Sequence, residues 1–188
     1  FPELKEAFYA KCVILIEGET EYGCIQSFAE TLDVSLDDNG ICVINASGEA
    51  SIKPLKCLLN AFVIPSVAIY DGDVKRGQTP NDDEFFTNEL CFEIEVVKHL
   101  YSHGDKSVIK AIVCDLNSNA ENEVLDTDFV RKPFKKIGLD INTYIPKKLS
   151  DISEDDSEEF CNMYSSWYMV KKGVLLGRII GQTLSAEQ

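Results

Sequence analysis

Short apolar runs alternate with longer amphipathic stretches through the first half of the chain. Residues 12–16 read CVILI, residues 41–44 read ICVI, and a third run, VAIY, begins at Val67. Continuous short runs rich in branched residues are typical of strands that are buried on both faces of a sheet. The stretches between the runs carry apolar residues at helical spacing, first at Ile25, Phe28, Ala29 and Leu32 and then at Ile52, Leu55, Leu58, Leu59 and Phe62.

This alternation predicts the order strand, helix, strand, helix, strand. Helical crossovers between short buried strands imply a parallel sheet with right-handed connections. Pro54 would lie in the first turn of the second helix, where its missing N–H does no harm. We therefore expect an α/β fold in which the carboxyl ends of all three strands lie at one edge of the sheet.

The second half of the chain has a less regular pattern, in which helical spacing dominates. The predicted elements are a loop over residues 77–88, a helix over 92–100, a strand or a helix at 107–115, a helix over 126–137 interrupted by Pro133, a short edge strand at 141–145 and one long helix over 160–184.

These patterns divide the chain into three predicted parts. Residues 1–11 read as the end of a preceding helix or a linker, because the chain opens at Phe1 without an initiator methionine. Residues 12–106 form the predicted α/β core. Residues 107–188 form a mostly helical extension that completes the domain.

Composition bears on the cellular location of this domain and on the partners that it can bind. No segment is long and apolar enough to span a bilayer. The seven cysteines lie mostly inside apolar runs without paired CxxC motifs, which favours reduced core residues of a cytoplasmic protein. A net charge of −14 argues against an unaided polyanion binder. Basic residues nevertheless cluster locally, at Lys75 and Arg76, at Arg131, Lys132, Lys135 and Lys136, at Lys147 and Lys148, and at Lys171, Lys172 and Arg178.

Acidic residues follow two of the predicted strands. Glu17 comes directly after the first strand, and Asp71 and Asp73 follow the third in the sequence VAIYDGD. Gly72 would let the chain turn as it leaves the sheet, so that both aspartates address one point. Oxygen-only ligands favour Mg²⁺ or Mn²⁺ over Zn²⁺. The alternative for Asp-Gly-Asp is an ordinary turn.

Two histidines form a second candidate for a metal site. His99 and His103 are spaced i, i+4, which could place two imidazoles together. Ser102, Gly104 and Asp105 surround them and favour an exposed helix end instead.

The chain resembles a known family where these motifs meet. IEGETE after an apolar strand, and VINASGEASIKPLKCLLNAFVIPSVAIYDGD further on, are similar to the Toprim domain, a Rossmann-like parallel sheet flanked by helices. The form looks most like the C-terminal Toprim domain of the OLD (overcoming lysogenization defect) nucleases. That class includes the nuclease subunit of Gabija anti-phage systems. The resemblance is dense over residues 13–73 and thinner beyond.

The resemblance implies a DNA endonuclease that uses two divalent ions and acts in defence against phage. Glu17 and Glu21 would serve one metal, and Asp71 and Asp73 the other. Glu93 would be a further ligand, although an exposed helix face explains it equally well. Lys172, or its neighbour Lys171, would reach the scissile phosphate as a fixed positive charge. Glu17, Asp71 and Lys172 are thus the catalytic candidates.

The resemblance also implies partners. Relatives carry an N-terminal ATPase that dimerises, whereas GxxxxGK[ST] is absent from this sequence, so an ATPase would lie outside it. Two other functions stay open: a non-catalytic Toprim module that binds metal or a partner, and another phosphoryl-transfer enzyme. A haloacid-dehalogenase-type enzyme would need D-x-D-x-T, and Lys75 stands at the threonine position.

Overall fold

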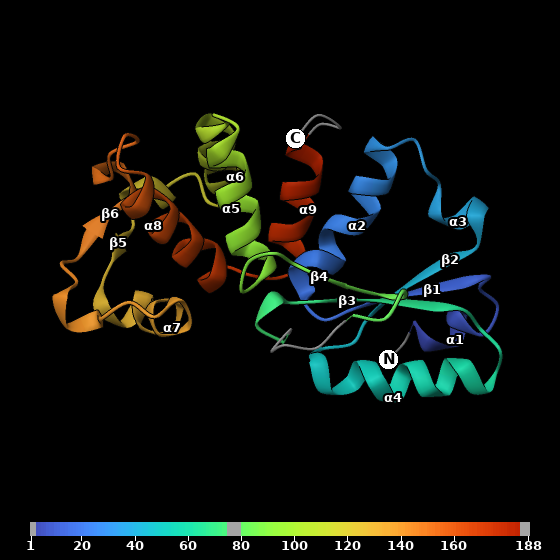
Figure 1. Cartoon of the computed structure of the whole chain (residues 1–188). Helices are drawn as coiled ribbons and strands as arrows, with labels where there is room; N and C mark the ends of the chain where they lie inside the picture. Colours follow the sequence, from blue (N-terminus) through green and yellow to red (C-terminus); the bar gives the residue numbers. More distant parts are fainter. Residues whose placement is uncertain (1–2, 75–79, 185–188) are drawn as a thin grey trace.

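The computed structural model describes residues 3–74 and 80–184. In it, the first half of the chain folds around a parallel sheet (Figure 1). The sheet has four strands in the order β2-β1-β3-β4, all paired in parallel. The α/β class and the first three strands, predicted from the sequence, are confirmed. The strands are β1 (Cys12–Ile16), β2 (Ile41–Asn45), β3 (Ser66–Tyr70) and β4 (Glu84–Phe86).

Strand β4 corrects the prediction of a loop over residues 77–88. It pairs with β3 through only three positions, from Ala68 opposite Glu84 to Tyr70 opposite Phe86. A strand this short at the edge of a sheet has no continuous apolar run, so the sequence carries little signal for it. It nevertheless brings Thr87 next to the end of β3, where Thr87 N donates to Tyr70 O.

Helices cover both faces of the sheet. Figure 1 shows α4 (Glu49–Ala61) and the short α1 (Leu4–Ala7) on one face and α2 (Glu19–Thr31) on the other, with α3 (Leu36–Asn39) leading into β2. Because α4 begins at Glu49, Pro54 lies in its second turn and not in the first, as the sequence had suggested. The buried face of α4 carries Ile52, Leu55 and Leu59.

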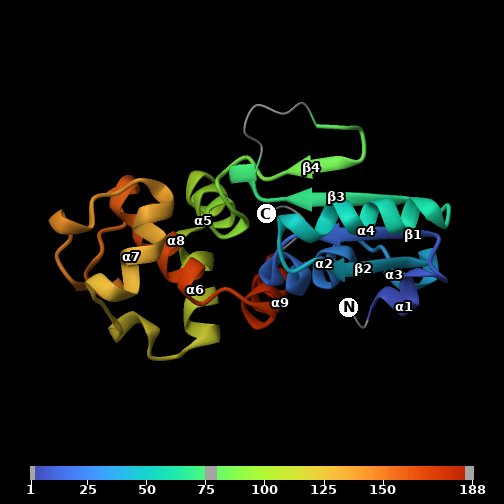
Figure 2. The same ribbon diagram turned by 90° about the horizontal axis from the view of Figure 1, so that it is seen from below.

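Helices α5 (Phe92–Ser102), α6 (Lys106–Leu116), α7 (Thr127–Ile137) and α8 (Ser157–Val170) form a second lobe, which faces the carboxyl ends of the strands (Figure 2). The last helix, α9 (Val174–Thr183), lies against α2. Residues 107–115, which fitted either a strand or a helix, lie within α6. Pro133 lies inside α7 without interrupting it.

The prediction of an edge strand over residues 141–145 is wrong. Residues 141–145 contain a 3₁₀ turn, Ile141–Thr143, instead of an edge strand. The short strand comes two residues later, where β6 (Lys147–Lys148) pairs antiparallel with β5 (Val124–Leu125). Two-residue strands are too short for an alternating pattern to reveal.

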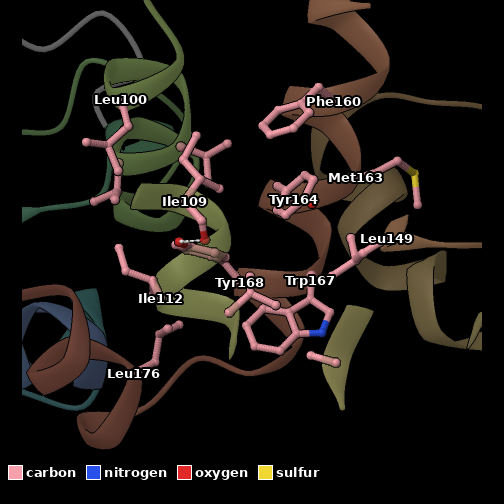
Figure 3. Close-up of a cluster of buried hydrophobic side chains, with 14 of the residues drawn as sticks. Leu100, Ile109, Ile112, Leu149, Phe160, Met163, Tyr164, Trp167, Tyr168 and Leu176 are labelled. Carbon is pink, nitrogen blue, oxygen red and sulfur yellow. Dashed lines mark hydrogen bonds between the residues drawn. The ribbon is translucent and has the colours of Figure 1, made fainter. Parts of the chain in front are cut away.

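Aromatic side chains of α8 fill the core of the helical lobe (Figure 3). Trp167 and Tyr168 are fully buried, and Phe160 stacks on Tyr164 with ring centroids 4.2 Å apart. The Tyr168 hydroxyl donates to Ile109 O at 3.1 Å, which satisfies its polar group inside an apolar core. This contact fixes α8 against α6.

The predicted single helix over residues 160–184 is two helices. Helix α8 ends at Val170, and the chain turns through Gly173, whose φ of +149° favours glycine, before α9 begins. Helix α9 then packs along α2. A Cβ on Gly177 would lie 1.9 Å from Thr20 O, so the two helices approach too closely there for any side chain. The last helix of the chain therefore returns to the sheet lobe (Figure 1).

The proposed division into residues 1–11, 12–106 and 107–188 stays a prediction, and α9 of the third part lies against α2 of the second. In the part of the chain that the structure describes, no helix has the length and apolar character needed to cross a membrane. All seven cysteines are free thiols.

Candidate functional site

The ends of β1 and β3 are joined by side-chain hydrogen bonds. Glu17 follows β1, and its Oε2 accepts from Asp71 N at 3.1 Å. Asp71 follows β3, and its Oδ1 accepts from Phe92 N at 3.1 Å, at the start of α5. A carboxylate at a helix N-terminus is favoured by the partial positive charge there. One oxygen of each carboxylate is thus held by backbone.

Gly72 separates Asp71 from Asp73 for a reason that differs from the predicted one. Gly72 begins a 3₁₀ turn, Gly72–Val74, and its N–H donates to Thr87 Oγ1 at 2.8 Å. A Cβ on Gly72 would lie 2.0 Å from Glu89 O. The position therefore needs glycine because another backbone segment approaches it, and its φ is not among the positive ones.

Asp71 and Asp73 do point at one position, and a lysine ammonium lies there. Lys136 of α7 places its Nζ 3.5 Å from Asp71 Oδ2 and 3.1 Å from Asp73 Oδ2. Sequence reasoning placed Lys136 only in a basic cluster. Nothing in the local sequence of α7 signals an ion pair with residues more than sixty positions earlier.

Glu21 and Glu93 are buried beside these carboxylates. Their side chains are 9% and 5% exposed, so the interpretation of Glu93 as part of an exposed helix face is wrong. Glu21 lies in the first turn of α2 and Glu93 in the first turn of α5. A Cβ on Gly18 would lie 2.4 Å from Glu21 Oε2, so this glycine makes room for the carboxylate.

Thr20 connects these acidic residues to the end of the chain, and the sequence analysis missed it. Its hydroxyl donates to Glu93 Oε1 at 2.7 Å and accepts from Gly173 N at 3.1 Å. Thr20 is 1% exposed. The only sequence signal was a hydroxyl residue inside the acidic EGETE motif. Because Gly173 directly follows Lys172, the Thr20 hydroxyl also fixes the backbone that carries this lysine.

The two adjacent lysines at the end of α8 have different surroundings. Lys171 Nζ donates to Glu123 Oε1 at 3.0 Å and lies over the rings of Phe129 and Trp167. Lys172 instead lines the pocket formed by the acidic residues. Of the pair, Lys172 is therefore the lysine that faces the site.

Two adjoining pockets make up the candidate site. The acidic pocket, about 400 Å³ in volume, is lined by Glu17, Gly18, Glu19, Glu21, Asn45, Ser47, Gly48, Asp71, Glu93 and Lys172. The basic groove, about 580 Å³, shares Asp71, Glu93 and Lys172 with the acidic pocket. It is otherwise lined by Cys91, by the end of α8 and by α7, which contributes Asp128 as well as Arg131, Lys132 and Lys136. Asp73 does not line the acidic pocket and reaches the site through Lys136.

Burial and mutual repulsion raise the pKa values of several carboxyl groups in the site. Burial, reinforced by Glu93, Asp71 and Glu17, raises the pKa of Glu21 to about 8. Burial also raises the pKa values of Glu17 and Asp71 above their ordinary range. Burial would lower the pKa of Lys136, but nearby acidic groups, including Asp71 and Asp73, raise it above the ordinary value. Such a site gains most from an added cation.

The donor set fits a hard divalent cation in its chemistry. All the candidate ligands are carboxylate oxygens, which suit Mg²⁺ or Mn²⁺. Within residues 3–74 and 80–184, no three His, Cys, Asp or Glu side chains are close enough together to hold an ion as they stand. Lys136 lies between two of the proposed ligands, and Glu93 has one oxygen bonded to Thr20.

Other candidates lie away from the site. His99 and His103 lie side by side at the exposed end of α5, with ring centroids 4.2 Å apart and the rings tilted by 35°. Lys75 and Arg76 lie outside the described residues. Lys147 and Lys148 form β6 in the helical lobe, where Lys147 pairs with Glu159.

Comparisons with known proteins agree with the resemblance read from the motifs. Residues 8–73 match the family model of the TOPRIM domain of overcoming lysogenization defect (OLD) protein-like proteins. This segment contains Glu17, Glu21, Asp71 and Asp73. No curated protein matches the chain significantly.

Two solved structures share the fold over nearly the whole chain. Two structures of the C-terminal region of the Xanthomonas campestris pv. campestris OLD protein, phased with mercury and with iodine, align with TM-scores of 0.50 and 0.51. Their sequence identities to the chain are 19% and 18%. The alignments cover 95% and 96% of this chain and 88% of each of those chains. The C-terminal region of the Burkholderia pseudomallei OLD protein aligns at 19% identity with a TM-score of 0.47, over 95% of this chain and 92% of that one.

Substituting Thr20 tests the connection between the acidic residues and Lys172. Thr20→Val keeps the side-chain shape but leaves Glu93 Oε1 and Gly173 N without their buried partner. We expect a loss of about 1–3 kcal/mol in the free energy of unfolding, measured by urea denaturation. Thr31→Val, at the exposed end of the same helix, is the matched control and should change stability far less. Equal effects of the two substitutions would contradict the connection.

The raised pKa of Glu21 predicts how metal-free stability depends on pH. A raised folded-state pKa gives stabilisation that is complete below the unfolded value of 4.5 and is lost as the pH rises through about 8. We expect the Tm of the metal-free protein to fall across this window and Glu21→Gln to reduce the fall. At pH 8 the variant should be more stable by at least about 1.4 kcal/mol, the value of one pKa unit.

Glu19→Gln is the matched control for this measurement. Glu19 is exposed in the same helical turn, and its substitution removes the same charge. Thermal melts of all three proteins at several pH values separate a local effect from one of net charge. Parallel curves for wild type and Glu21→Gln would show that Glu21 ionises normally.

Proposed function

From the OLD-like Toprim domain that residues 8–73 form, we propose that this chain is a divalent-metal-dependent DNA endonuclease that hydrolyses phosphodiester bonds. The observation that supports it most is the acidic pocket itself. Carboxylates from separate segments, Glu17 and Glu21, Asp71, and Glu93, line it together with Lys172. Metal-binding oxygens and a lysine in one pocket are the groups that phosphodiester hydrolysis needs.

The proposed ligands are Glu17, Glu21, Asp71, Asp73 and Glu93, and Mg²⁺ or Mn²⁺ is the proposed cofactor, with two ions. When bound, the cations would activate a water molecule and neutralise the charge on the phosphate. The backbone N–H of Phe92 orients Asp71, leaving Oδ2 for a cation. Asp71 N orients Glu17 in the same way, leaving Oε1.

Lys172 is proposed to hold the scissile phosphate. It lines both the acidic pocket and the basic groove, so this residue lies where the two adjoin. A fixed positive charge at that place stabilises the negative charge that develops on the phosphate oxygens. Lys171 is engaged with Glu123 and two aromatic rings and is not proposed for this role.

A non-catalytic module that binds metal or a partner is the alternative, and one observation favours it. Lys136 already neutralises Asp71 and Asp73, so the carboxylates are partly satisfied without an ion. Cleavage assays separate the two functions, because such a module would bind metal without cutting any nucleic acid.

The wider setting is also a proposal. The Xanthomonas structures are C-terminal regions of OLD proteins. By analogy we propose an ATPase domain or subunit on the N-terminal side of this chain, with oligomerisation through it and a role in defence against phage DNA. The free cysteines support a cytoplasmic location.

Asp71→Asn tests the metal-dependent cleavage. Asparagine keeps an oxygen for the Phe92 N–H but removes the charge that a cation needs. We expect nicking or linearisation of plasmid DNA by wild type with Mg²⁺ or Mn²⁺, and a loss of roughly 10²-fold or more in the variant. Asp115→Asn, on the exposed side of α6, is the matched control and should cleave like wild type. Undiminished cleavage by Asp71→Asn would place the activity elsewhere.

The lysine pair provides a separate test. Lys172→Met should lower the cleavage rate by roughly 10²–10³-fold with little change in stability, because the side chain is exposed and faces the site. Lys171→Met should lower stability, because it removes the contact with Glu123, while folded protein stays active. Initial rates of plasmid cleavage and thermal melts of both variants measure this. The reverse pattern would assign the role to Lys171.

A further inference from the structure

We propose that Lys136 is a phosphate-binding residue that exchanges partners: it pairs with Asp71 and Asp73 in the metal-free protein and moves to the nucleic-acid backbone when cations take those carboxylates. This inference rests on the proposed function and adds to it a residue from outside the matched segment 8–73. The basic groove would then bind the DNA strand beside the scissile bond.

The position of Lys136 carries the argument. Its ammonium lies 3.5 Å and 3.1 Å from one oxygen of each aspartate, and the same side chain lines the basic groove. Asp71 keeps its place without it, because its Oδ1 accepts from Phe92 N, and the backbone of Asp73 lies in the 3₁₀ turn Gly72–Val74. An ammonium and a divalent cation cannot both occupy the space between the two carboxylates. Cation binding therefore requires Lys136 to leave.

The groove gives Lys136 a place to go. Arg131 and Lys132, which precede Lys136 by five and four residues on α7, also line the groove, as does Lys172, just after the end of α8. The groove, about 580 Å³ in volume, is also lined by Asp71, Glu93 and Asp128, and Arg131 pairs with Asp128 at 3.1 Å. With cations bound at Asp71 and Glu93, the ammonium groups of Lys132, Lys136 and Lys172 suit phosphates of a strand. A lysine side chain is 32% exposed here and flexible, so a small rotation suffices.

This exchange explains how one site serves two charge states. Without metal, Lys136 offsets the repulsion between buried carboxylates. With metal, its charge becomes available for DNA, so that strong phosphate binding at this residue accompanies metal loading. The two binding events are thereby coupled, and each strengthens the other.

The experiment compares Lys136→Met with Lys135→Met in the whole chain. Lys135 is the adjacent residue, is exposed and lines neither pocket, so it controls for the loss of one positive charge. Calorimetric titration with Mn²⁺ should show about threefold to tenfold tighter binding by Lys136→Met than by Lys135→Met, because no ammonium needs displacement.

A second measurement uses a short DNA duplex with Ca²⁺ at several salt concentrations. Lys136→Met should bind more weakly and lower the slope of log K against log salt by about one, whereas Lys135→Met should leave the slope unchanged. Lys136→Arg keeps the charge and should retain the wild-type slope. Circular dichroism of each variant checks that it folds.

Mn²⁺ binding by Lys136→Met that equals or falls below that of Lys135→Met overturns the proposal, and so does an unchanged salt slope. These readouts do not require cleavage. If the wild-type protein fails to cut DNA but Lys136→Met shows both expected shifts, the endonuclease function fails and the exchange stands.

Discussion

Electrostatic repulsion among buried carboxylates is the constraint around which this structure is arranged. A parallel sheet places the ends of β1 and β3 at one edge, and α2 and α5 begin there, so Glu17, Glu21, Asp71 and Glu93 meet in one pocket. Each is partly or wholly removed from water. Backbone N–H groups, the Thr20 hydroxyl and the Lys136 ammonium offset the burial and the repulsion only in part: the pKa of Glu21 stays raised, first by burial and then by its acidic neighbours. A folded site that keeps such unfavourable charge fits a function in which a cation is taken up.

The close packing of α9 on α2 brings the far end of the chain to this edge. Gly177 allows helix contact at the Thr20 carbonyl, and the Thr20 hydroxyl holds Gly173. Lys172 is thus placed by the packing of α9 on α2 and by the hydrogen bond from Gly173 N to the Thr20 hydroxyl. The helical lobe contributes a second cation, Lys136, from α7. The site is therefore shared between lobes, and neither the sheet nor the helices alone would assemble it.

The sequence predicted the parts of this arrangement that local patterns encode. The bounds of β1 matched the predicted strand, and the acidic residues at strand ends met at one edge because parallel topology requires it. The break between α8 and α9 was missed, because apolar spacing continues across Lys171 and Lys172 and only Gly173 marks the turn. The roles of Thr20 and Lys136 depend on contacts across more than sixty positions, which no local spacing encodes. For Glu93 the pattern left two interpretations open, and its burial excludes the exposed helix face, while its role as a metal ligand stays a prediction.

The acidic composition and a polyanionic substrate are compatible once the charges are located. The net charge of −14 is a sum over the whole sequence, whereas a phosphate interacts mainly with charges within about one Debye length, roughly 8–10 Å. Near the site, Arg131, Lys132, Lys136 and Lys172 line a single groove. Five carboxylates line the adjoining acidic pocket with Lys172, where divalent cations would compensate them. Without metal, the basic groove alone would have to overcome the repulsion between a phosphate and the carboxylates of the acidic pocket. Binding of DNA would therefore depend on metal. Under the proposed function, the charge distribution would thus favour contact with DNA only after cations are bound.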